Sequence, residues 1–277
     1  MYKLLGISVV VVFGMLLWQL WPTSKLEVVV AFLDVGQGDA IFIESPTGRQ
    51  MLVDGGPDAA VLGALNEVMP WLDRSLDVVV ATHPDADHIG GLVPVLEAYA
   101  VERVLTTGAT AETDIFQGVY DAVLDEGSEV VLVRRGSVID MGGGLMAEVL
   151  FPEQVFEVGD RNVNSLVMRL EFGDTSWLLT GDAGIEQEEY LVETMPEKIQ
   201  VNVLKLGHHG SKSSSGDALL AATQPDVAVV SAGRDNRYGH PDKEVLDRLH
   251  RYGIPVLGTP TSGTIMTMSD GQTINVK

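Results

Sequence analysis

Short runs of β-branched and apolar residues recur along the chain from Leu26 onward, and stretches with helical periodicity separate them. The strand patterns in the first half fall at 27–35, 40–46, 49–56, 77–83, 129–133 and 145–151. The helical patterns there fall at 59–69, 89–99 and 113–124. In the second half, strand patterns alternate with helices near 184–195, 216–223 and 241–252, and three strands end the chain. This alternation predicts a single α/β domain built from two mixed halves, because no linker rich in Pro, Gly or Ser divides it.

The N-terminal segment differs from the rest of the chain, because residues 4–21 carry no charged side chain. A helix over these residues would be about 27 Å long, which nearly spans a bilayer. Trp18 and Trp21 fall where an aromatic belt would lie, and Pro22 ends the helix. We therefore predict one N-terminal transmembrane helix in residues 1–25 and a single domain in residues 26–277, held at the cell membrane on its extracytoplasmic side. A cleaved signal peptide, which would release a secreted protein, is the alternative.

The chain of 277 residues contains no cysteine. This excludes disulfide bonds, thiolate nucleophiles and cysteine-bound zinc, so any metal must bind His, Asp or Glu. The 39 Asp and Glu residues outnumber the 18 Lys and Arg residues, which gives a formal net charge of -21. An evenly acidic surface repels phosphate backbones, so the composition excludes a wide basic surface for nucleic acid.

The motif THPDADHIGG at 82–91 places four metal-competent side chains directly after an apolar strand pattern: His83, Asp85, Asp87 and His88. In a turn that leaves a strand, residues two apart can converge on one ion while the next pair faces a second, so H-x-D-x-D-H fits a two-metal site. Asp-rich turns are also common helix caps, and single histidines are usually ordinary core or surface residues. We favour a metal site because five of the six histidines fall in predicted strand-end loops.

Three later loops supply further candidate ligands. Asp182 ends the strand pattern LLTGD, His208 and His209 follow VNVLKLG, and His240 lies in YGHP. We expect each of them at the carboxyl end of a predicted strand, where α/β proteins build their sites. The sixth histidine, His250, is expected on the surface of a helix. The loop DVGQGD at 34–39 is interpreted as a glycine-assisted hairpin whose edges face the site.

Five strings of the sequence resemble the metallo-β-lactamase superfamily, and more narrowly the extracytoplasmic metallohydrolase domain of ComEC-type DNA uptake proteins. They are FLDVGQGDAIFIESPTGRQMLVDGG (32–56), THPDADHIGG (82–91), NSLVMRLEFGDTSWLLTGD (164–182), LKLGHHGSKSS (204–214) and SAGRDNRYGHP (231–241). The resemblance spans about residues 26–270 and implies a four-layer αββα sandwich with a binuclear metal centre between its halves. It also implies cleavage of phosphodiester bonds in DNA and a link to competence.

The resemblance also implies roles for single residues. His83 and Asp85 resemble ligands of a first metal ion, Asp87 and His88 ligands of a second, and Asp182 the bridging carboxylate. His208, His209 and His240 complete the implied ligand set, although the sequence does not decide which of His208 and His209 faces the metal. Asp54 would orient the ligand loop. Where the superfamily often has a third histidine for the first ion, this chain has RNVNSLV, so Asn164 or a water fills the position, or the site is weaker there.

The same ligands lead to an expected chemistry. Many superfamily members have His at the position of Asp85, and the carboxylate shifts the expected pair of divalent ions toward Mn²⁺ relative to Zn²⁺. A hydroxide that bridges the two ions would be the nucleophile. We expect catalytic roles for Asp87, His209, Lys212 and His240, with Lys212 or a protonated histidine stabilising the phosphate or assisting the leaving oxygen. The alternative for Lys212 is a solvated lysine in a serine-rich loop.

These observations predict a membrane-anchored, metal-dependent phosphodiesterase or nuclease whose substrate is DNA. Lactonases, β-lactamases and choline-phosphate esterases of the same fold use the same ligands and are alternatives. A DNA-handling module of this fold without turnover is a further alternative. A single span forms no pore, so in a competence system the DNA-uptake channel must be another polypeptide or be absent. The sequence indicates no oligomeric state.

The late loops are less acidic than the rest of the chain. Between residues 205 and 243, Lys205, Lys212, Arg234, Arg237 and Lys243 stand against Asp217, Asp226, Asp235 and Asp242. Bound metal ions would add positive charge where the acidic ligands converge. We therefore expect a phosphodiester to be held by a metal pair and a few loop cations, and we expect weak DNA binding without metal.

Overall fold

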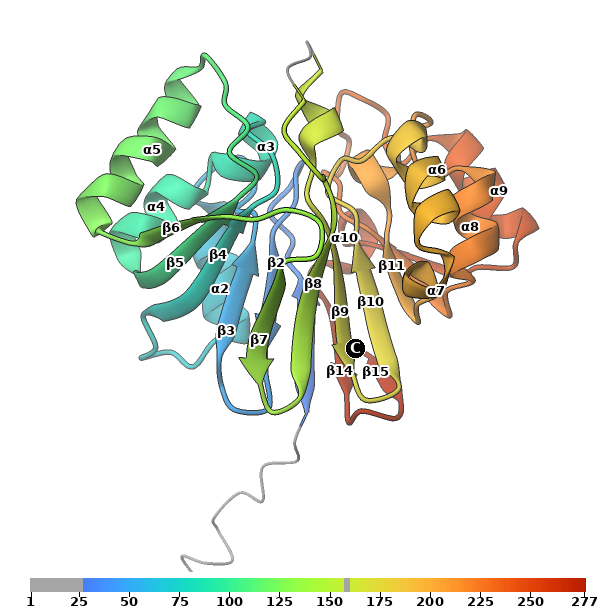
Figure 1. The fold of residues 1–277 in the computed structure, drawn as a ribbon, viewed down its shortest axis with the longest axis horizontal. Coiled ribbons are helices and arrows are strands. Elements are labelled where there is room, and N and C mark those ends of the chain that lie inside the picture. The colour runs from blue at the N-terminus through green and yellow to red at the C-terminus, as the bar shows by residue number, and fades with distance from the viewer. Residues whose placement is uncertain (1–26, 157–159) are drawn as a thin grey trace, which may run out of the picture.

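The computed structural model describes residues 27–156 and 160–277 of the chain. In this part of the chain, two β-sheets pack face to face and helices cover the outer face of each sheet (Figure 1). The expected αββα arrangement is therefore confirmed. The transmembrane helix predicted for residues 1–25 lies outside the described residues. Of the helices in the described ranges, none has the length and apolar character needed to cross a bilayer.

The first sheet has eight strands and contains most of the first half of the chain. Its strands are β1 (Val28–Phe32), β2 (Ile41–Glu44), β3 (Gln50–Val53), β4 (Ser75–Ala81), β5 (Ala100–Thr106), β6 (Glu129–Leu132), β14 (Ile265–Ser269) and β15 (Ile274–Val276). The helices that pack on it are α2 (Ala60–Val68), α3 (Ala86–Ile89), α4 (Leu92–Ala98) and α5 (Asp114–Glu126). The strand order is β15-β14-β1-β2-β3-β4-β5-β6, so the last two strands of the chain join the sheet beside β1.

The second sheet has seven strands in the order β13-β12-β11-β10-β9-β8-β7. These strands are β7 (Val138–Gly142), β8 (Leu145–Phe151), β9 (Val167–Phe172), β10 (Thr175–Leu179), β11 (Val203–Lys205), β12 (Val227–Val230) and β13 (Val256–Gly258). Its helices are α6 (Ile185–Thr194), α7 (Pro196–Ile199), α8 (Asp217–Thr223) and α9 (Lys243–Arg251), and α10 (Thr259–Ser262) follows β13. Two 3₁₀ turns, η1 (Arg161–Asn164) and η2 (Gly207–Gly210), complete this half.

Alternation of side chains along the strands builds the cores. In β1, Val28, Val30 and Phe32 pack between the two sheets, whereas Ala31 packs under the helices. Trp177 of β10 is fully buried between the sheets, and its Nε1 donates to the hydroxyl of Thr267 in β14 at 2.9 Å. The two halves of the chain therefore share one apolar layer, which holds their loops in fixed relative positions.

Parallel pairing brings the predicted ligand loops together. β3, β4, β5 and β6 run parallel in the first sheet, and β10, β11, β12 and β13 run parallel in the second. The loops that follow β4, β10 and β11 leave the sandwich at the end that is uppermost in Figure 1. This is the edge of each sheet at which the carboxyl ends of parallel strands meet.

The structure contains two strands and two short helices, α7 and α10, that the sequence does not predict, and it divides one predicted helix in two. β5 and β7 have no counterpart among the predicted strands, because two charged residues interrupt the apolar pattern of β5 and β7 is largely exposed. The predicted helix at 89–99 belongs to two helices, α3 and α4, which meet at Gly90 and Gly91. A Cβ atom at Gly91 would lie 1.9 Å from the carbonyl oxygen of Gly55, so this turn packs against backbone at a distance that only glycine allows.

Candidate metal centre

The turn after β4 carries the first ligand motif. His83 and Asp85 lie in the short connection between β4 and α3, and Asp87 and His88 lie on α3 itself. The two histidines are buried, whereas the two aspartates are partly exposed. The motif therefore turns two imidazole rings inward and leaves two carboxylates nearer the rim.

The second half of the chain supplies the opposite wall. Asp182 lies shortly after β10, and His208 and His209 lie in η2, directly after β11. Both histidines have positive φ angles, of 46° and 54°, which residues other than glycine rarely adopt. Such strain persists where surrounding contacts hold it and is frequent at functional sites. His209 is buried and His208 is half-buried, so the turn presents one ring to the interior and one to the rim.

Asp182 lies at the centre of the cluster. Its Oδ2 lies 3.9 Å from Nε2 of His83, 3.7 Å from Nε2 of His208 and 3.6 Å from Nε2 of His209. Its Oδ1 lies 3.2 Å from Nε2 of His88. Four histidines from both halves of the chain thus face one carboxylate, and both His208 and His209 reach it.

Several buried polar atoms of the cluster have no hydrogen-bond partner among the described residues: Nε2 of His83, His88 and His209, and Oδ1 of Asp182. The 3.2 Å contact between His88 and Asp182 is therefore an ion-pair distance without hydrogen-bond alignment. Each unpaired buried atom costs about 1–3 kcal/mol, so a group of them in one place calls for a ligand.

The chemistry of the donors fits a metal ion. Asp39, His88, Asp182 and His209 each offer one ligand atom, and these four atoms lie within 4.8 Å of one another. Imidazole nitrogen and carboxylate oxygen without sulfur suit divalent ions such as Mn²⁺ and Zn²⁺. The residues present therefore fit a divalent metal centre.

Asp54 holds His88 from behind. Its Oδ2 lies 2.7 Å from Nδ1 of His88, and the carboxylate also accepts hydrogen bonds from the main-chain N–H and the hydroxyl of Thr82, at 2.9 and 2.7 Å. Burial lowers the pKa of His88, but Asp182 and Asp54 outweigh burial and raise this pKa well above its ordinary value. Asp54 therefore fixes the ring with Nε2 facing Asp182, in the way that outer partners commonly orient metal-binding histidines.

Asp39 and Lys205 belong to the cluster although neither is among the predicted ligands. Oδ1 of Asp39 lies 3.3 Å from Nδ1 of His209, and the same nitrogen lies 3.0 Å from the carbonyl oxygen of Ser231. Oδ2 of Asp39 lies 2.7 Å from Nζ of Lys205, which is fully buried. Burial raises the pKa of Asp39, but Lys205 and His209 outweigh burial and hold it below its usual range. Two features of the sequence could have indicated these residues. Asp39 is the last residue of DVGQGD, and Lys205 lies inside the apolar strand VNVLKLG.

Asp85 forms an ion pair with a side chain of the same protein, Arg161. Nε of Arg161 lies 2.6 Å from Oδ1 of Asp85, and Nε2 of His83 lies 3.8 Å from Oδ2.

Asn164, at the position where the superfamily often has a histidine, binds the main chain of Phe156. Its Oδ1 accepts from the N–H of Phe156 at 2.8 Å, and its Nδ2 donates to the carbonyl at 2.9 Å. Both ends of the Asn164 amide are therefore engaged in holding this loop.

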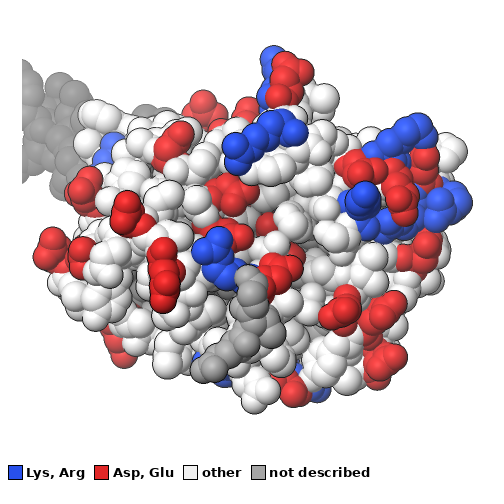
Figure 2. All heavy atoms as spheres, turned by 90° about the horizontal axis from the view of Figure 1, so that it is seen from above, with Lys and Arg blue, Asp and Glu red and all other residues white. Residues whose placement is uncertain are grey.

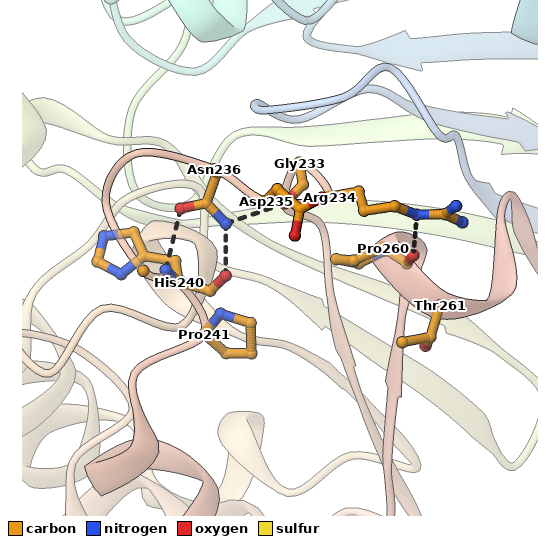
Figure 3. A pocket seen from close by; sticks show the side chains of 9 residues that line it. Gly233, Arg234, Asp235, Asn236, His240, Pro241, Pro260 and Thr261 are labelled. Atoms are coloured by element: carbon orange, nitrogen blue, oxygen red, sulfur yellow. Dashed lines mark hydrogen bonds between the residues drawn. The ribbon is translucent and has the colours of Figure 1, made fainter.

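His240 does not directly follow a strand, contrary to expectation, because a long loop separates it from the end of β12 at Val230. The loop lines a pocket of about 590 Å³ (Figure 3). Asn236 holds the loop in shape, since its Oδ1 accepts from the N–H of His240 at 3.0 Å and its Nδ2 donates to the carbonyl of Gly233 at 2.9 Å. The His240 ring lies 6.0 Å from the ring of His208, so His240 is placed at the rim of the cluster.

Lys212, a predicted catalytic residue, and His250, a predicted surface residue, both lie on the surface. Lys212 is exposed in the loop after η2, and His250 is exposed on α9 as expected.

Figure 2 views the end of the molecule that carries the ligand loops. Carboxylates lie toward the middle of this face, and the basic side chains stand apart or are mixed with acidic ones. The described part of this face therefore carries separate cations and no continuous basic surface.

Comparison with known proteins identifies the family. The family described as "Metallo-beta-lactamase superfamily" matches residues 33–234, which contain every predicted ligand except His240. The chain belongs to this superfamily. A crystal structure of the metallo-beta-lactamase fold protein YhfI from Bacillus subtilis superposes with a TM-score of 0.60 at 14% identity, and covers 88% of this chain and 100% of YhfI. At this identity the likeness concerns the fold.

Two curated relatives, one of them named a competence protein, are similar to most of this chain. ComE operon protein 3 of Bacillus subtilis (strain 168) is 35% identical over 268 residues, which cover 91% of this chain and 34% of that protein. Competence protein ComA of Neisseria gonorrhoeae is 33% identical over 243 residues, which cover 86% of this chain and 32% of that protein. The chain thus spans about a third of the length of these relatives.

Proposed function

We propose that this chain is a metal-dependent phosphodiesterase that cleaves DNA outside the cytoplasm. The observation that carries the proposal is the convergence of unpaired imidazole and carboxylate atoms from both halves of the chain around Asp182. Similarity to a protein named for competence supports DNA as the substrate. A phosphodiester also suits the charge of this face, because a metal centre and a few separate cations can hold one phosphate without a wide basic surface.

The proposed ligands are the residues whose free atoms surround Asp182. His83 and Asp85 would contribute to one ion, and Asp87, His88 and His209 to the other. Divalent ions bound there would neutralise charge on the phosphate oxygens and lower the pKa of a water molecule that attacks phosphorus. Asp54 keeps His88 aimed at this centre, and Asp39 with the carbonyl of Ser231 does the same for His209. We assign His208 as an additional ligand from the rim.

Two residues at the rim are proposed to act on the substrate. Lys212 is exposed, so its ammonium group can meet a phosphate oxygen without leaving a buried partner. His240 lines the pocket in Figure 3, and we propose that it exchanges a proton with a leaving oxygen. We also propose that residues 1–25 anchor the chain in the membrane and that a DNA-uptake channel protein is its partner.

The test is a cleavage assay on the full chain in mild detergent with Mn²⁺, Zn²⁺ or Mg²⁺, using single-stranded and double-stranded DNA. We expect metal-dependent cleavage that Asp182→Asn lowers more than about a hundredfold, because loss of a shared ligand should exceed the 10–100-fold effect of losing an outer partner. Asp247→Asn, on the exposed surface of α9, is the matched control and should keep full activity.

A chain that hydrolyses a lactone, a β-lactam or a phosphocholine ester but leaves DNA intact would refute the substrate. A chain that binds metal and cleaves none of these would refute the enzymatic role and favour a DNA-handling module. Metal content is therefore measured on the same samples.

A further inference from the structure

We infer that the two halves of the cluster bind divalent metal unequally: the half built on His88, His209 and Asp182 holds the tightly bound ion, and Arg161 competes with metal for Asp85 in the other half. The inference rests on the proposed metal-dependent function, because it concerns the same ligands. Its test measures metal binding without substrate, so its failure and the failure of DNA cleavage are separate results.

The half around His88 has a full set of oriented donors. Nε2 of His88 and Nε2 of His209 are buried and free of hydrogen bonds, and Oδ2 of Asp87 lies 3.3 Å from Nε2 of His209. Asp182 offers a buried carboxylate to both rings. Asp54 fixes one ring from behind, and a backbone carbonyl fixes the other. Donors that are held in place in this way bind metal more tightly than free ones.

The half around His83 has fewer donors that other residues hold in place. Nε2 of His83 lies 3.8 Å from Asp85 and 3.9 Å from Asp182, which gives one imidazole and two carboxylates, one of them shared. His208 adds a second imidazole from the rim, 3.7 Å from Asp182, but its side chain is half-buried and no outer partner fixes its ring among the described residues. Asn164 does not replace the missing histidine, because both ends of its amide bind the main chain of Phe156. Ligands without outer partners that orient them bind metal more weakly, so this half should have the lower affinity.

Arg161 weakens this half further. Its Nε lies 2.6 Å from Oδ1 of Asp85, and a guanidinium group stays protonated at any ordinary pH. A metal ion that binds Asp85 must displace this cation or share the carboxylate with it. The guanidinium also binds phosphate as well as carboxylate, so Arg161 can exchange Asp85 for an oxygen of the substrate and supply positive charge there.

The charges around the cluster agree with one tightly bound ion. Lys205 already pairs with Asp39, and Arg161 already pairs with Asp85. Among the described residues, Asp87 and Asp182 have no Lys or Arg within ion-pair distance. One divalent ion balances the charge of these two carboxylates, whereas Asp54 is held by the N–H and hydroxyl of Thr82 and by Nδ1 of His88.

The experiment titrates the full chain with Mn²⁺ in mild detergent after removal of metal with a chelator, and follows free Mn²⁺ by electron paramagnetic resonance. The wild-type chain should bind one Mn²⁺ tightly and a second at least roughly tenfold more weakly. Arg161→Gln should strengthen the second step roughly tenfold and leave the first unchanged. Arg49→Gln is the matched control, because Arg49 lies 3.3 Å from Asp77 with side chains 33% and 30% exposed, against 40% and 25% for Arg161 and Asp85.

Arg161→Ala serves as a second variant, and circular dichroism verifies that each variant folds. Two Mn²⁺ ions of equal affinity in the wild-type chain would overturn the inference, whatever the variants do. A second affinity that fails to rise in either folded Arg161 variant, or that rises equally in Arg49→Gln, would overturn the role of Arg161. If neither Arg161 variant folds, the two affinities of the wild-type chain decide the inference alone.

Discussion

Replacement of Lys205 by Met should lower the free energy of unfolding by about 3–5 kcal/mol. Lys205 and Asp39 are 0% and 2% exposed, and Nζ lies 2.7 Å from Oδ2. Removing the ammonium group leaves the buried carboxylate without its lysine partner and, among the described residues, with only His209 at 3.3 Å, and breaking a buried ion pair typically costs about 3–5 kcal/mol. In a domain of this size, the loss corresponds to a Tm lower by roughly 6–20 °C.

Urea unfolding of the full chain measures this change through tryptophan fluorescence, because Trp177 is fully buried between the sheets. The double variant Lys205→Met with Asp39→Asn should be more stable than Lys205→Met alone by about 2 kcal/mol or more, since it removes the unpaired charge. Lys198→Met is the matched control. The ion pair of Lys198 with Glu148 has side chains 40% and 25% exposed, so its loss should cost at most about 1 kcal/mol.

The reasoning would be refuted if Lys205→Met cost no more than the Lys198 control. It would also be refuted if the double variant were no more stable than Lys205→Met, because the penalty would then not come from the unpaired carboxylate. In either case the free energy of unfolding would not depend on the pairing of Asp39 with Lys205.

Three further predictions concern the site, the pH dependence of stability and the substrate. Asp54→Asn should weaken Mn²⁺ binding 10–100-fold, about the usual effect of losing an outer partner, because His88 loses its orienting carboxylate. A titration with Mn²⁺ measures this change, and an unchanged affinity would contradict the prediction. Burial raises the pKa of Glu188 to about 7 from an ordinary value of 4.5, although main-chain hydrogen bonds favour its ionised form. The folded state therefore holds this proton more strongly than the unfolded state, so the contribution of Glu188 to stability should be lost as pH rises through this range. Urea unfolding from pH 4.5 to pH 8 should show a smaller loss with rising pH in Glu188→Gln than in the wild-type chain, and equal slopes would count against the shift. Tyr238 lies in the loop of His240, and the two rings stack with their centroids 5.8 Å apart. Tyr238→Leu should raise KM for single-stranded DNA at least about fivefold, because the exposed part of the ring can stack on a base for about 1–3 kcal/mol. Tyr120→Leu, with 54% exposure against 52% for Tyr238, should leave KM unchanged, and equal effects of the two variants would rule out stacking at Tyr238.

Much of the fold follows from local sequence patterns. The alternation of apolar strands and helices predicts the two halves, because each element shows its own periodicity and turn residues. The motif from His83 to His88 is recognisable because its four side chains lie on one short turn between β4 and α3. The strand pattern does not predict β5, because Glu102 and Arg103 interrupt its apolar run.

The contacts that tune the site are not local, and the sequence does not reveal them. Asp39 and Lys205 meet across the two halves of the chain, and nothing near either residue marks the other as its partner. The pairing of Arg161 with Asp85 also depends on how two distant loops pack. The sequence leaves the role of Asn164 open, and it does not reveal that both ends of this amide bind the main chain of Phe156.

The direction of β1 has a consequence for a chain attached to a membrane. β1 starts at Val28, opposite Ser269, and its other end leads into the loop that carries Asp39. Its five residues cover about 17 Å, roughly twice the distance over which physiological salt screens charge. The proposed anchor would therefore precede β1 at the end of that strand opposite the metal centre. Anionic lipid headgroups would then exert little repulsion on DNA at the metal centre, so the rate of cleavage should not depend on the lipid charge of the membrane.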